Sequence, residues 1–394
     1  MPRFEPFRAL RYAAPDLEPL LAPPYDVLDA ADVDALQARS PQNVTRVDVP
    51  RGGADRYGVA ATTLDGWVAD GVLVLDPEPS FTIYRLRFAD GHGVARDVAG
   101  VLGALEVVDA GAGGVLPHER TTPKDSTDRL ELTRATRANL SPVWGLSLAA
   151  GLADLLAAPG ELVGRLVDDA YGRRVEHVWE RVTDPERVRA IRDLLASDDV
   201  LIADGHHRYA VGRTFRDEVR AATGRTDTAA ELTLAFVAEL VADQLSVEPI
   251  HRLYSGVDPA ALRAALERSF VLTEVAGDEG TVSAVNATSM VLLTADGAWR
   301  LDPRPGVLDG VRALDGVWLE TTLDGLDPQV AYHAGVQPAL DAVTQGRAVA
   351  AVLVRPPSLA EIERTAREGL LMPPKSTFFT PKLKTGAVLR PLDL

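Results

Sequence analysis

The stretch "LIADGHHRYAVG" (residues 201–212) decides the fold of this chain. The apolar run at 200–203 predicts a short buried strand, and the apolar spacing over 208–222 predicts a helix. Between the two lies a polar turn made of Asp204, Gly205, His206, His207 and Arg208. The stretch therefore predicts a strand, a tight turn and the beginning of a helix.

The polar turn has the chemistry of an anion site. The N-terminus of a helix presents free backbone N–H groups and the positive end of the helix dipole. Gly205 permits close backbone approach, and Arg208 offers an oxyanion a fork of donors. Asp204 suits a proton acceptor or a ligand of a divalent metal. Adjacent histidines on a turn point in different directions, which argues against a zinc pair. The structural alternative is that Asp204 caps the helix and the histidines bond local carbonyls.

A second polar segment, "LPHERTTPKDSTDRLELTRATRANLSP" (116–142), interleaves charges with hydroxyls. Cations neutralise a phosphoryl group, hydroxyls orient it and a carboxylate accepts a proton, so this composition suits a phosphate clamp. Glu119 is the candidate base. The candidates for phosphate or substrate binding are His118, Thr121, Lys124, Asp128, Arg129 and Asn139. The alternative is a solvated loop that leads into a helix from about residue 127.

The third segment, "MPPKSTFFTPKLKTG" (372–386), is a lysine-dense patch in a lysine-poor chain. The candidates here for phosphate binding are Lys375, Ser376, Thr377 and Lys382. The glycine-rich lead of a P-loop is missing, so the segment is not a Walker A motif. A solubilising tail is the alternative. Weaker candidates are Tyr25, Asp26, Asn43, Arg46 and Asp48 near the start of the chain, and the pair His251 and Arg252.

Composition limits the partners and the compartment. The chain has 394 residues, of which 46% are hydrophobic and 25% charged, enough for a sizeable core. Its formal charge of −16 repels nucleic acid and anionic lipid. Cysteine is absent, which excludes disulfides and cysteine-ligated metal. No stretch approaches the roughly 18 apolar residues of a membrane span, and the sequence predicts a cytoplasmic protein.

Alternating patterns predict a mixed α/β (α+β) architecture. Expected strands lie at 80–88, 98–108, 200–203, 231–241 and 289–295. Expected helices lie at 57–71, 151–167, 184–197, 208–222, 258–270, 334–346 and 358–370. In the helix at 184–197 Asp184 is the expected N-cap, followed by Pro185 at the first helical position. We expect two portions, residues 1–245 and an α/β portion at 246–394 that carries the basic phosphate-binding tail.

Separated landmarks in this order resemble a bacterial and archaeal domain family of unknown function. They include "PFRALRY" (6–12), "APPYDV" (22–27), "PHE" (117–119), "ADGHHRY" (203–209) and "MPPKST" (372–377). The turn at 204–208 is also similar to the strand–turn–helix signature of the ParB/sulfiredoxin superfamily, which includes free-serine kinases. The resemblance implies a ParB/sulfiredoxin-like fold for residues 1–245.

What the resemblance implies for function is a phosphotransferase that converts free L-serine to O-phospho-L-serine, with inorganic pyrophosphate, ADP or ATP as donor. Glu119 or Asp204 would be the base, His206 would act at the reacting phosphate, and Gly205, His207 and Arg208 would bind donor phosphates. Mg²⁺ is the expected cofactor, with Asp204 as its candidate ligand.

Two other hypotheses stay open. One is a ParB-like nucleotide-binding regulatory protein, which predicts a basic recognition element that this acidic chain lacks. The other is a metal-dependent phosphohydrolase that uses His118, Asp204, His206 and His207. The donor, the identity of the acceptor, the metal and the oligomeric state are not determined by the sequence.

Overall fold

The chain is described by a computed structural model over residues 1–91, 93–120, 123–170 and 172–393. It divides into two units. Unit 1 comprises residues 1–246 and 380–394, and unit 2 comprises residues 247–379. The sequence predicted a single boundary near 245. The structure differs in the tail, because residues 380–394 belong to unit 1.

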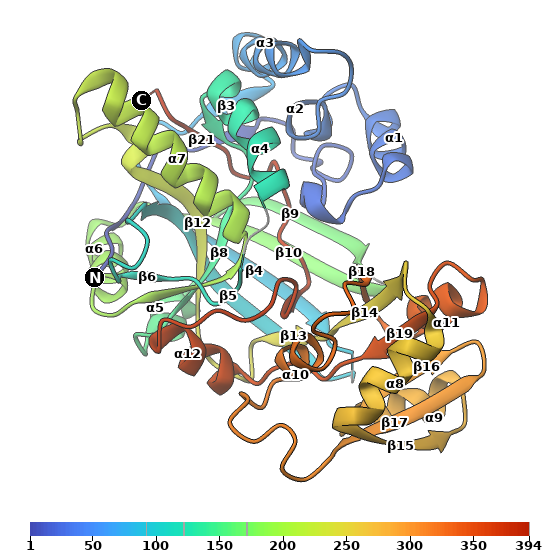
Figure 1. Ribbon diagram of the computed structural model, residues 1–394. Coiled ribbons are helices and arrows are strands. Elements are labelled where there is room, and N and C mark those ends of the chain that lie inside the picture. Colours follow the sequence, from blue (N-terminus) through green and yellow to red (C-terminus); the bar gives the residue numbers. More distant parts are fainter. Residues whose placement is uncertain (92, 121–122, 171, 394) are drawn as a thin grey trace. The chain divides into compact units, whose positions relative to one another are not determined.

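Unit 1 is built on a mixed sheet (Figure 1). Within the described residues it has nine strands, in the order β6-β11-β8-β12-β5-β4-β10-β9, with β1 paired to β5. The bounds are β1 Phe4–Glu5, β4 Phe81–Ala89, β5 Ala95–Glu106, β6 Val115–Leu116, β8 Val143–Ser147, β9 Glu161–Ala170, β10 Arg173–Val182, β11 Val200–Asp204 and β12 Leu232–Glu239. The pairs β6–β11 and β8–β12 are parallel, and the other pairs are antiparallel.

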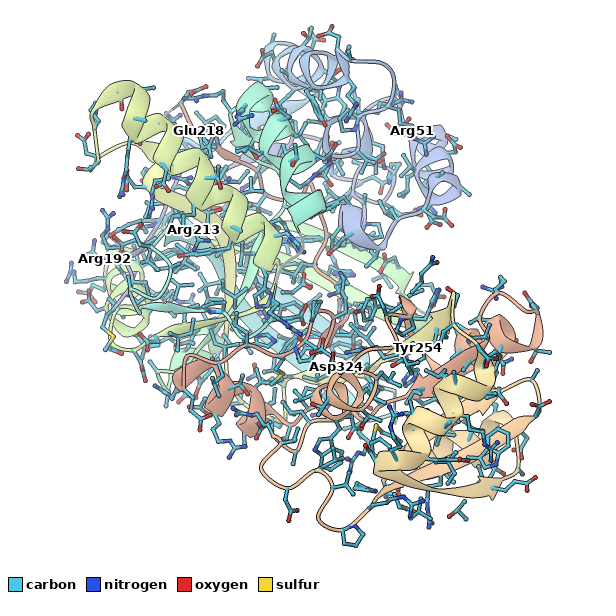
Figure 2. The ribbon with its side chains drawn as sticks, in the orientation of Figure 1. Arg51, Arg192, Arg213, Glu218, Tyr254 and Asp324 are labelled. Atoms are coloured by element: carbon cyan, nitrogen blue, oxygen red, sulfur yellow. The ribbon has the colours of Figure 1, made fainter. Side chains whose placement is uncertain are left out.

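Helices cover this sheet. The helices of unit 1 are α1 Ala30–Arg39, α2 Thr45–Asp48, α3 Arg56–Ala69, α4 Pro123–Thr136, α5 Leu152–Ala157, α6 Pro185–Leu195 and α7 His206–Thr223. Apolar side chains of α5 and α6, such as Leu156 and Ile191, share one buried cluster with Phe81 and Val237 of the sheet. Helices α4 and α7 lie side by side (Figure 1). Glu218, which projects from α7 in Figure 2, accepts a 2.9 Å hydrogen bond from Arg134 Nε of α4.

Short strand pairs tie the two ends of the chain into unit 1. Strand β2 (Leu10–Tyr12) pairs with β3 (Leu73–Leu75), and β7 (Ala138–Asn139) pairs with β21 (Arg390–Pro391). The strand β21 therefore places the C-terminal segment beside the end of α4. Two 3₁₀ turns, η1 (Tyr25–Val27) and η2 (Ala229–Glu231), complete the unit.

Unit 2 has an antiparallel sheet of its own, in the order β15-β17-β16-β19-β14-β18. Its strands are β14 Ile250–Ser255, β15 Phe270–Val275, β16 Met290–Thr294, β17 Gly297–Pro303, β18 Gln329–Ala334 and β19 Ala350–Leu353. Its helices are α8 Pro259–Ser269, α9 Glu279–Asn286, α10 Asp315–Thr322, α11 Val336–Thr344 and α12 Leu359–Arg367. Two apolar clusters, one around Phe270 and one around Val291, form its core. Strands β13 (Ser246–Glu248) and β20 (Phe378–Thr380) pair where the chain enters and leaves this unit.

The mixed α/β class is confirmed, and most expected elements are present. The helix expected at 151–167 is wrong in its second half. It ends at Ala157, before Pro159 and Gly160, and residues 161–170 form β9, which pairs with β10. Proline cannot continue a helix, and the β9–β10 hairpin supplies pairing partners that a helical reading cannot anticipate. Within the described part of the chain, no helix has both the length and the apolar character needed to cross a bilayer.

Candidate active site

The turn between β11 and α7 adopts the expected strand–turn–helix geometry. Gly205 stands before the helix with a φ of 86°, in the left-handed region that favours glycine. A Cβ at this position would lie 3.0 Å from Cζ of Arg208. Glycine is therefore required both for the backbone conformation and for the approach of the Arg208 guanidinium.

Asp204, at the end of β11, bonds two cations. Arg208 Nη2 lies 2.6 Å from Oδ2, and Lys382 Nζ lies 2.7 Å from Oδ1. Arg208 also donates to the Pro142 carbonyl. The side chains of Arg208 and Lys382 are 9% and 6% exposed. We call Asp204, Gly205, Arg208 and Lys382 the Asp204 corner; it holds two buried positive charges and one negative charge at a helix N-terminus.

The charge on Arg208 is maintained although its side chain is buried. Burial alone lowers its pKa, but the surrounding acids Asp204, Asp26, Tyr25 and Asp48 more than offset this and the pKa is raised overall. A buried guanidinium surrounded by acidic side chains keeps its positive charge and its planar set of N–H donors. Such a group is suited to hold an anion.

His118 and His206 lie against the corner. His118 Nδ1 donates to the Ile202 carbonyl at 2.7 Å, and its backbone N–H lies 3.4 Å from His206 Nε2. The two rings meet edge to face, with centroids 4.8 Å apart. Burial lowers the pKa of His118 to about 4, partly offset by the Ile202 carbonyl and by Asp204. His118 is therefore a neutral group that orients the turn at neutral pH. Glu119, half-buried, follows it in the chain.

Arg129 of α4 is anchored to a second cluster. Its Nη1 donates to the Asp48 carbonyl at 2.6 Å, its Nη2 bonds Asp128 Oδ2 at 2.6 Å, and its guanidinium lies 4.2 Å from the ring centre of Tyr25. Burial raises the pKa of Asp48, although Arg129 and Arg208 act in the opposite direction. The segments around Tyr25 and Asp48, which the sequence marked as weak candidates, thus surround Arg129.

Asp128 is also held in place. Tyr57 Oη donates to its Oδ1 at 2.7 Å, and the pKa of Asp128 is lowered because hydrogen bonds from Tyr57 and Arg129 outweigh the effect of burial. Asn139 Oδ1 accepts from the Leu234 backbone N–H at 3.0 Å. Both residues therefore have structural partners in addition to any part in binding.

A small cavity joins three of the predicted residues. Arg129, Asn139 and Arg208 line it together with Asp48, and its volume is about 50 Å³. This is room for roughly three water molecules. The distant segments at 116–142 and 201–212 thus converge in unit 1.

The remaining predicted residues are distributed differently. Lys375, Ser376 and Thr377 belong to unit 2, whereas Lys382 belongs to unit 1, so the predicted tail cluster is divided. His207 lies in the first turn of α7. Thr121 and the side chain of Lys124 lie outside the described residues.

In unit 2, Ser376 Oγ donates to the Pro373 carbonyl at 2.7 Å, and Arg252 Nη1 donates to the Lys375 carbonyl at 2.9 Å. Arg252, which the sequence marked as a weak candidate, lines a cavity of about 340 Å³ together with Tyr254 and Asp324, which are labelled in Figure 2.

The described residues do not offer a ready metal site. Each oxygen of Asp204 bonds a cation, and no group of three His, Asp or Glu side chains within the described part of the chain is placed to hold a metal ion. This arrangement does not fit Mg²⁺ on Asp204, and we derive no step through that ion.

Comparison with known proteins identifies the family of the chain. The model of a family described as "Protein of unknown function (DUF1015)" matches residues 4–327. The chain belongs to this family. The match covers the Asp204 turn and confirms the family resemblance expected from the landmarks. No curated protein matches the DUF1015 chain.

Several solved structures show a remote likeness to this DUF1015 chain. A free serine kinase in complex with AMP is 14% identical, with a TM-score of 0.41, over 71% of this chain and 89% of that chain. A conserved hypothetical protein from Pyrococcus furiosus is 14% identical, with a TM-score of 0.40, over 70% and 92%. SbnI with C-terminal truncation from Staphylococcus aureus is 14% identical, with a TM-score of 0.42, over 74% and 87%. Likeness at this level does not extend to activity or ligand.

Sequence reasoning missed three residues of unit 1, Tyr84, Asp168 and His177. They form a polar ring with Lys384, a member of the lysine-dense segment. The one signal in the sequence was the position of Lys384, two residues after Lys382 in the lysine-dense segment.

Proposed function

We propose that this protein is a phosphotransferase that phosphorylates free L-serine, with inorganic pyrophosphate or a nucleotide as donor. The observation that supports it best is the Asp204 corner. Two buried cations, a left-handed glycine and a helix N-terminus meet there, and each of these features favours a phosphate oxyanion. The choice of serine and of donor comes from the sequence resemblance.

In the proposed reaction the serine hydroxyl attacks the terminal phosphorus of the donor. The new O–P bond forms as the bridging P–O bond breaks, so pyrophosphate leaves as orthophosphate and a nucleotide leaves with one phosphate fewer. Arg208, Lys382 and the first amides of α7 hold the donor oxygens and stabilise the charge that spreads over them in the transition state.

Glu119 is the proposed base for the serine hydroxyl. Asp204 is less suited to this role, because each of its oxygens bonds a cation. It instead holds both cations, Arg208 through Oδ2 and Lys382 through Oδ1. The rings of His206 and His118 lie beside the turn, and His118 is neutral at neutral pH. Mg²⁺ is proposed only as a counter-ion of the donor phosphates and not as a ligand of Asp204, and no step of the proposed reaction depends on it.

Phosphorus NMR of the purified protein tests this proposal. L-serine is supplied with pyrophosphate, ADP or ATP in turn, each with and without Mg²⁺. The expected result is phosphoserine from one donor, with the signal lost in Glu119→Gln and greatly reduced in Lys382→Met. Donor hydrolysis without phosphoserine would instead indicate a phosphohydrolase, and no turnover of any donor would refute the proposal.

A further inference from the structure

Unit 1 contains a second, larger cavity of about 510 Å³ beside the Asp204 corner. Apolar side chains on one wall include Leu21, Val27, Leu36 and Leu166. The charged part of the lining includes Lys382, Lys384 and Asp168. We call it the Lys384 cavity. Because Lys382 also bonds Asp204, the cavity and the corner share one side chain.

A closed ring of hydrogen bonds begins and ends at Lys384. Its backbone N–H donates to Tyr84 Oη at 3.2 Å, and Tyr84 Oη lies 2.7 Å from His177 Nδ1. His177 Nε2 lies 3.1 Å from Asp168 Oδ1, and Asp168 Oδ2 accepts from Lys384 Nζ. Since Tyr84 Oη accepts from the backbone, its own proton is available for Nδ1, and Nε2–H then donates to Asp168.

The side chains of this hydrogen-bonded ring are shielded from solvent to different degrees. Tyr84 and His177 are 1% and 0% exposed, and the Lys384 side chain is 8% exposed. Burial lowers the pKa of His177, so its imidazole is neutral at neutral pH. The pKa of Asp168 is lowered to about 2, because bonds from His177 and Lys384 outweigh burial. Asp168 is thus an anion that fixes the Lys384 ammonium.

An arrangement of this kind costs free energy if its role is only structural. Buried ion pairs are often no more stabilising than apolar side chains of the same size, because both charges lose their hydration. Three polar side chains, Tyr84, His177 and Asp168, nevertheless hold Lys384 at the wall of a cavity. An ammonium has three N–H donors, and one of them suffices for Asp168.

We infer that the Lys384 cavity binds an α-amino acid, whose carboxylate bonds Lys384 and whose side chain reaches Lys382 and the Asp204 corner. Lys382 and Lys384 line the same cavity, so one bound molecule is in reach of both side chains. Asp32 and Asp169, also in the lining, supply negative charge for the ammonium. This inference rests on the proposed function and assigns its acceptor site.

The test compares L-serine with L-serinamide, which lacks the carboxylate charge. The wild-type protein is expected to prefer serine by roughly 10- to 100-fold in kcat/KM, the range of a charged hydrogen bond. In Lys384→Met the KM for serine rises and the preference collapses toward 1, whereas the KM for the donor is unchanged. Lys384→Arg, which keeps a cation, restores part of the preference.

Two matched variants separate position from charge. His177→Gln weakens the hold on Asp168, so it raises the KM for serine and reduces the preference for serine with little change in kcat. Arg165→Gln removes an exposed cation from β9 and leaves the preference as in the wild type. A serine preference in Lys384→Met equal to that of the wild type would overturn the inference.

Calorimetric titration with L-serine in the absence of donor distinguishes this inference from the proposed function. If the wild type binds serine and Lys384→Met does not, the cavity assignment holds even where no phosphoryl transfer is seen. If the wild type transfers phosphate but Lys384→Met binds serine normally, the assignment of the cavity is wrong and the proposed function stands. Absence of serine binding to the wild type also overturns the assignment.

Discussion

Gly205 is the residue on which the geometry of the corner depends. Its φ of 86° disfavours any other residue, and an added Cβ would meet Arg208 at 3.0 Å. We expect Gly205→Ala to lower the free energy of unfolding by more than the roughly 1–2 kcal/mol of a left-handed alanine, because the guanidinium must also move. Urea unfolding measures this.

Gly224, at the end of α7, provides the matched control for this prediction. Its φ is 70°, and a Cβ there would meet no atom within 4 Å. Gly224→Ala therefore has the backbone strain without the contact. Equal losses of stability in the two variants would show that the position of Arg208 does not require the absence of a Cβ at residue 205.

His118 makes stability depend on pH. Its pKa is about 4 in the folded protein and 6.5 ordinarily, so its contribution to stability is complete above about pH 6.5 and is lost as the pH falls toward 4. The difference corresponds to roughly 3 kcal/mol. We expect His118→Gln to flatten this part of the stability profile, measured by urea unfolding between pH 7 and pH 4.

The control for His118 is His333→Gln, which alters an exposed side chain on β18. The pKa values of His177 and His251 are also lowered by burial, so a residual loss of stability in acid remains in the His118 variant. A profile for His118→Gln that coincides with that of His333→Gln would contradict the assigned shift.

Sequence reasoning identified individual residues better than their partners. Asp204, Gly205 and Arg208 are neighbours in the chain, so their shared turn is visible in the sequence. The hydrogen bond from Lys382 to Asp204 joins residues 178 positions apart, so no local sequence pattern predicts it. The same is true of His177 and Asp168, whose surroundings depend on the pairing of β9 with β10.

At the scale of elements, the sequence predicted a helix correctly where a capping residue marks its first turn. Asp184 is the predicted N-cap of α6, and its Oδ1 accepts from the Arg187 backbone N–H at 2.8 Å. The hairpin β9–β10 was missed, since its strands are specified by pairing with each other and with β4 rather than by a sharp local pattern.

Removal of the α6 cap has a defined cost. We expect Asp184→Ala to lower the free energy of unfolding by about 1 kcal/mol, because the Arg187 N–H loses its acceptor. Asp184→Asn, which retains a capping oxygen, should lose only a few tenths. Thermal and urea unfolding of the two variants check this, and equal stabilities would show that the cap contributes nothing.

The whole molecule has a topology that the sequence did not reveal. Unit 2 interrupts unit 1, and the chain returns to unit 1 at Thr380. Composition alone cannot distinguish a C-terminal domain from an inserted one, because the difference lies in where residues 380–394 pack. Those residues supply Lys382, Lys384 and the strand β21.

Deletion of residues 380–394 should therefore affect unit 1 selectively. The loss of β21 removes the partner of β7, and the loss of both lysines leaves Asp204 and Asp168 without these cations. Hydrogen exchange is expected to accelerate in β7, β8 and β11, whereas the amides of β16 and β19 stay protected. Uniform acceleration in both units would contradict this division.

The insertion has a consequence for engineering. Ser246 and Thr380, the two points where unit 1 is interrupted, approach each other to 3.4 Å between their hydroxyl oxygens. A tight loop can therefore bridge them, and residues 247–379 can be excised as a cassette or exchanged for the corresponding segment of a relative. Such a miniature would keep the Asp204 corner and the Lys384 cavity on one continuous scaffold of much smaller size.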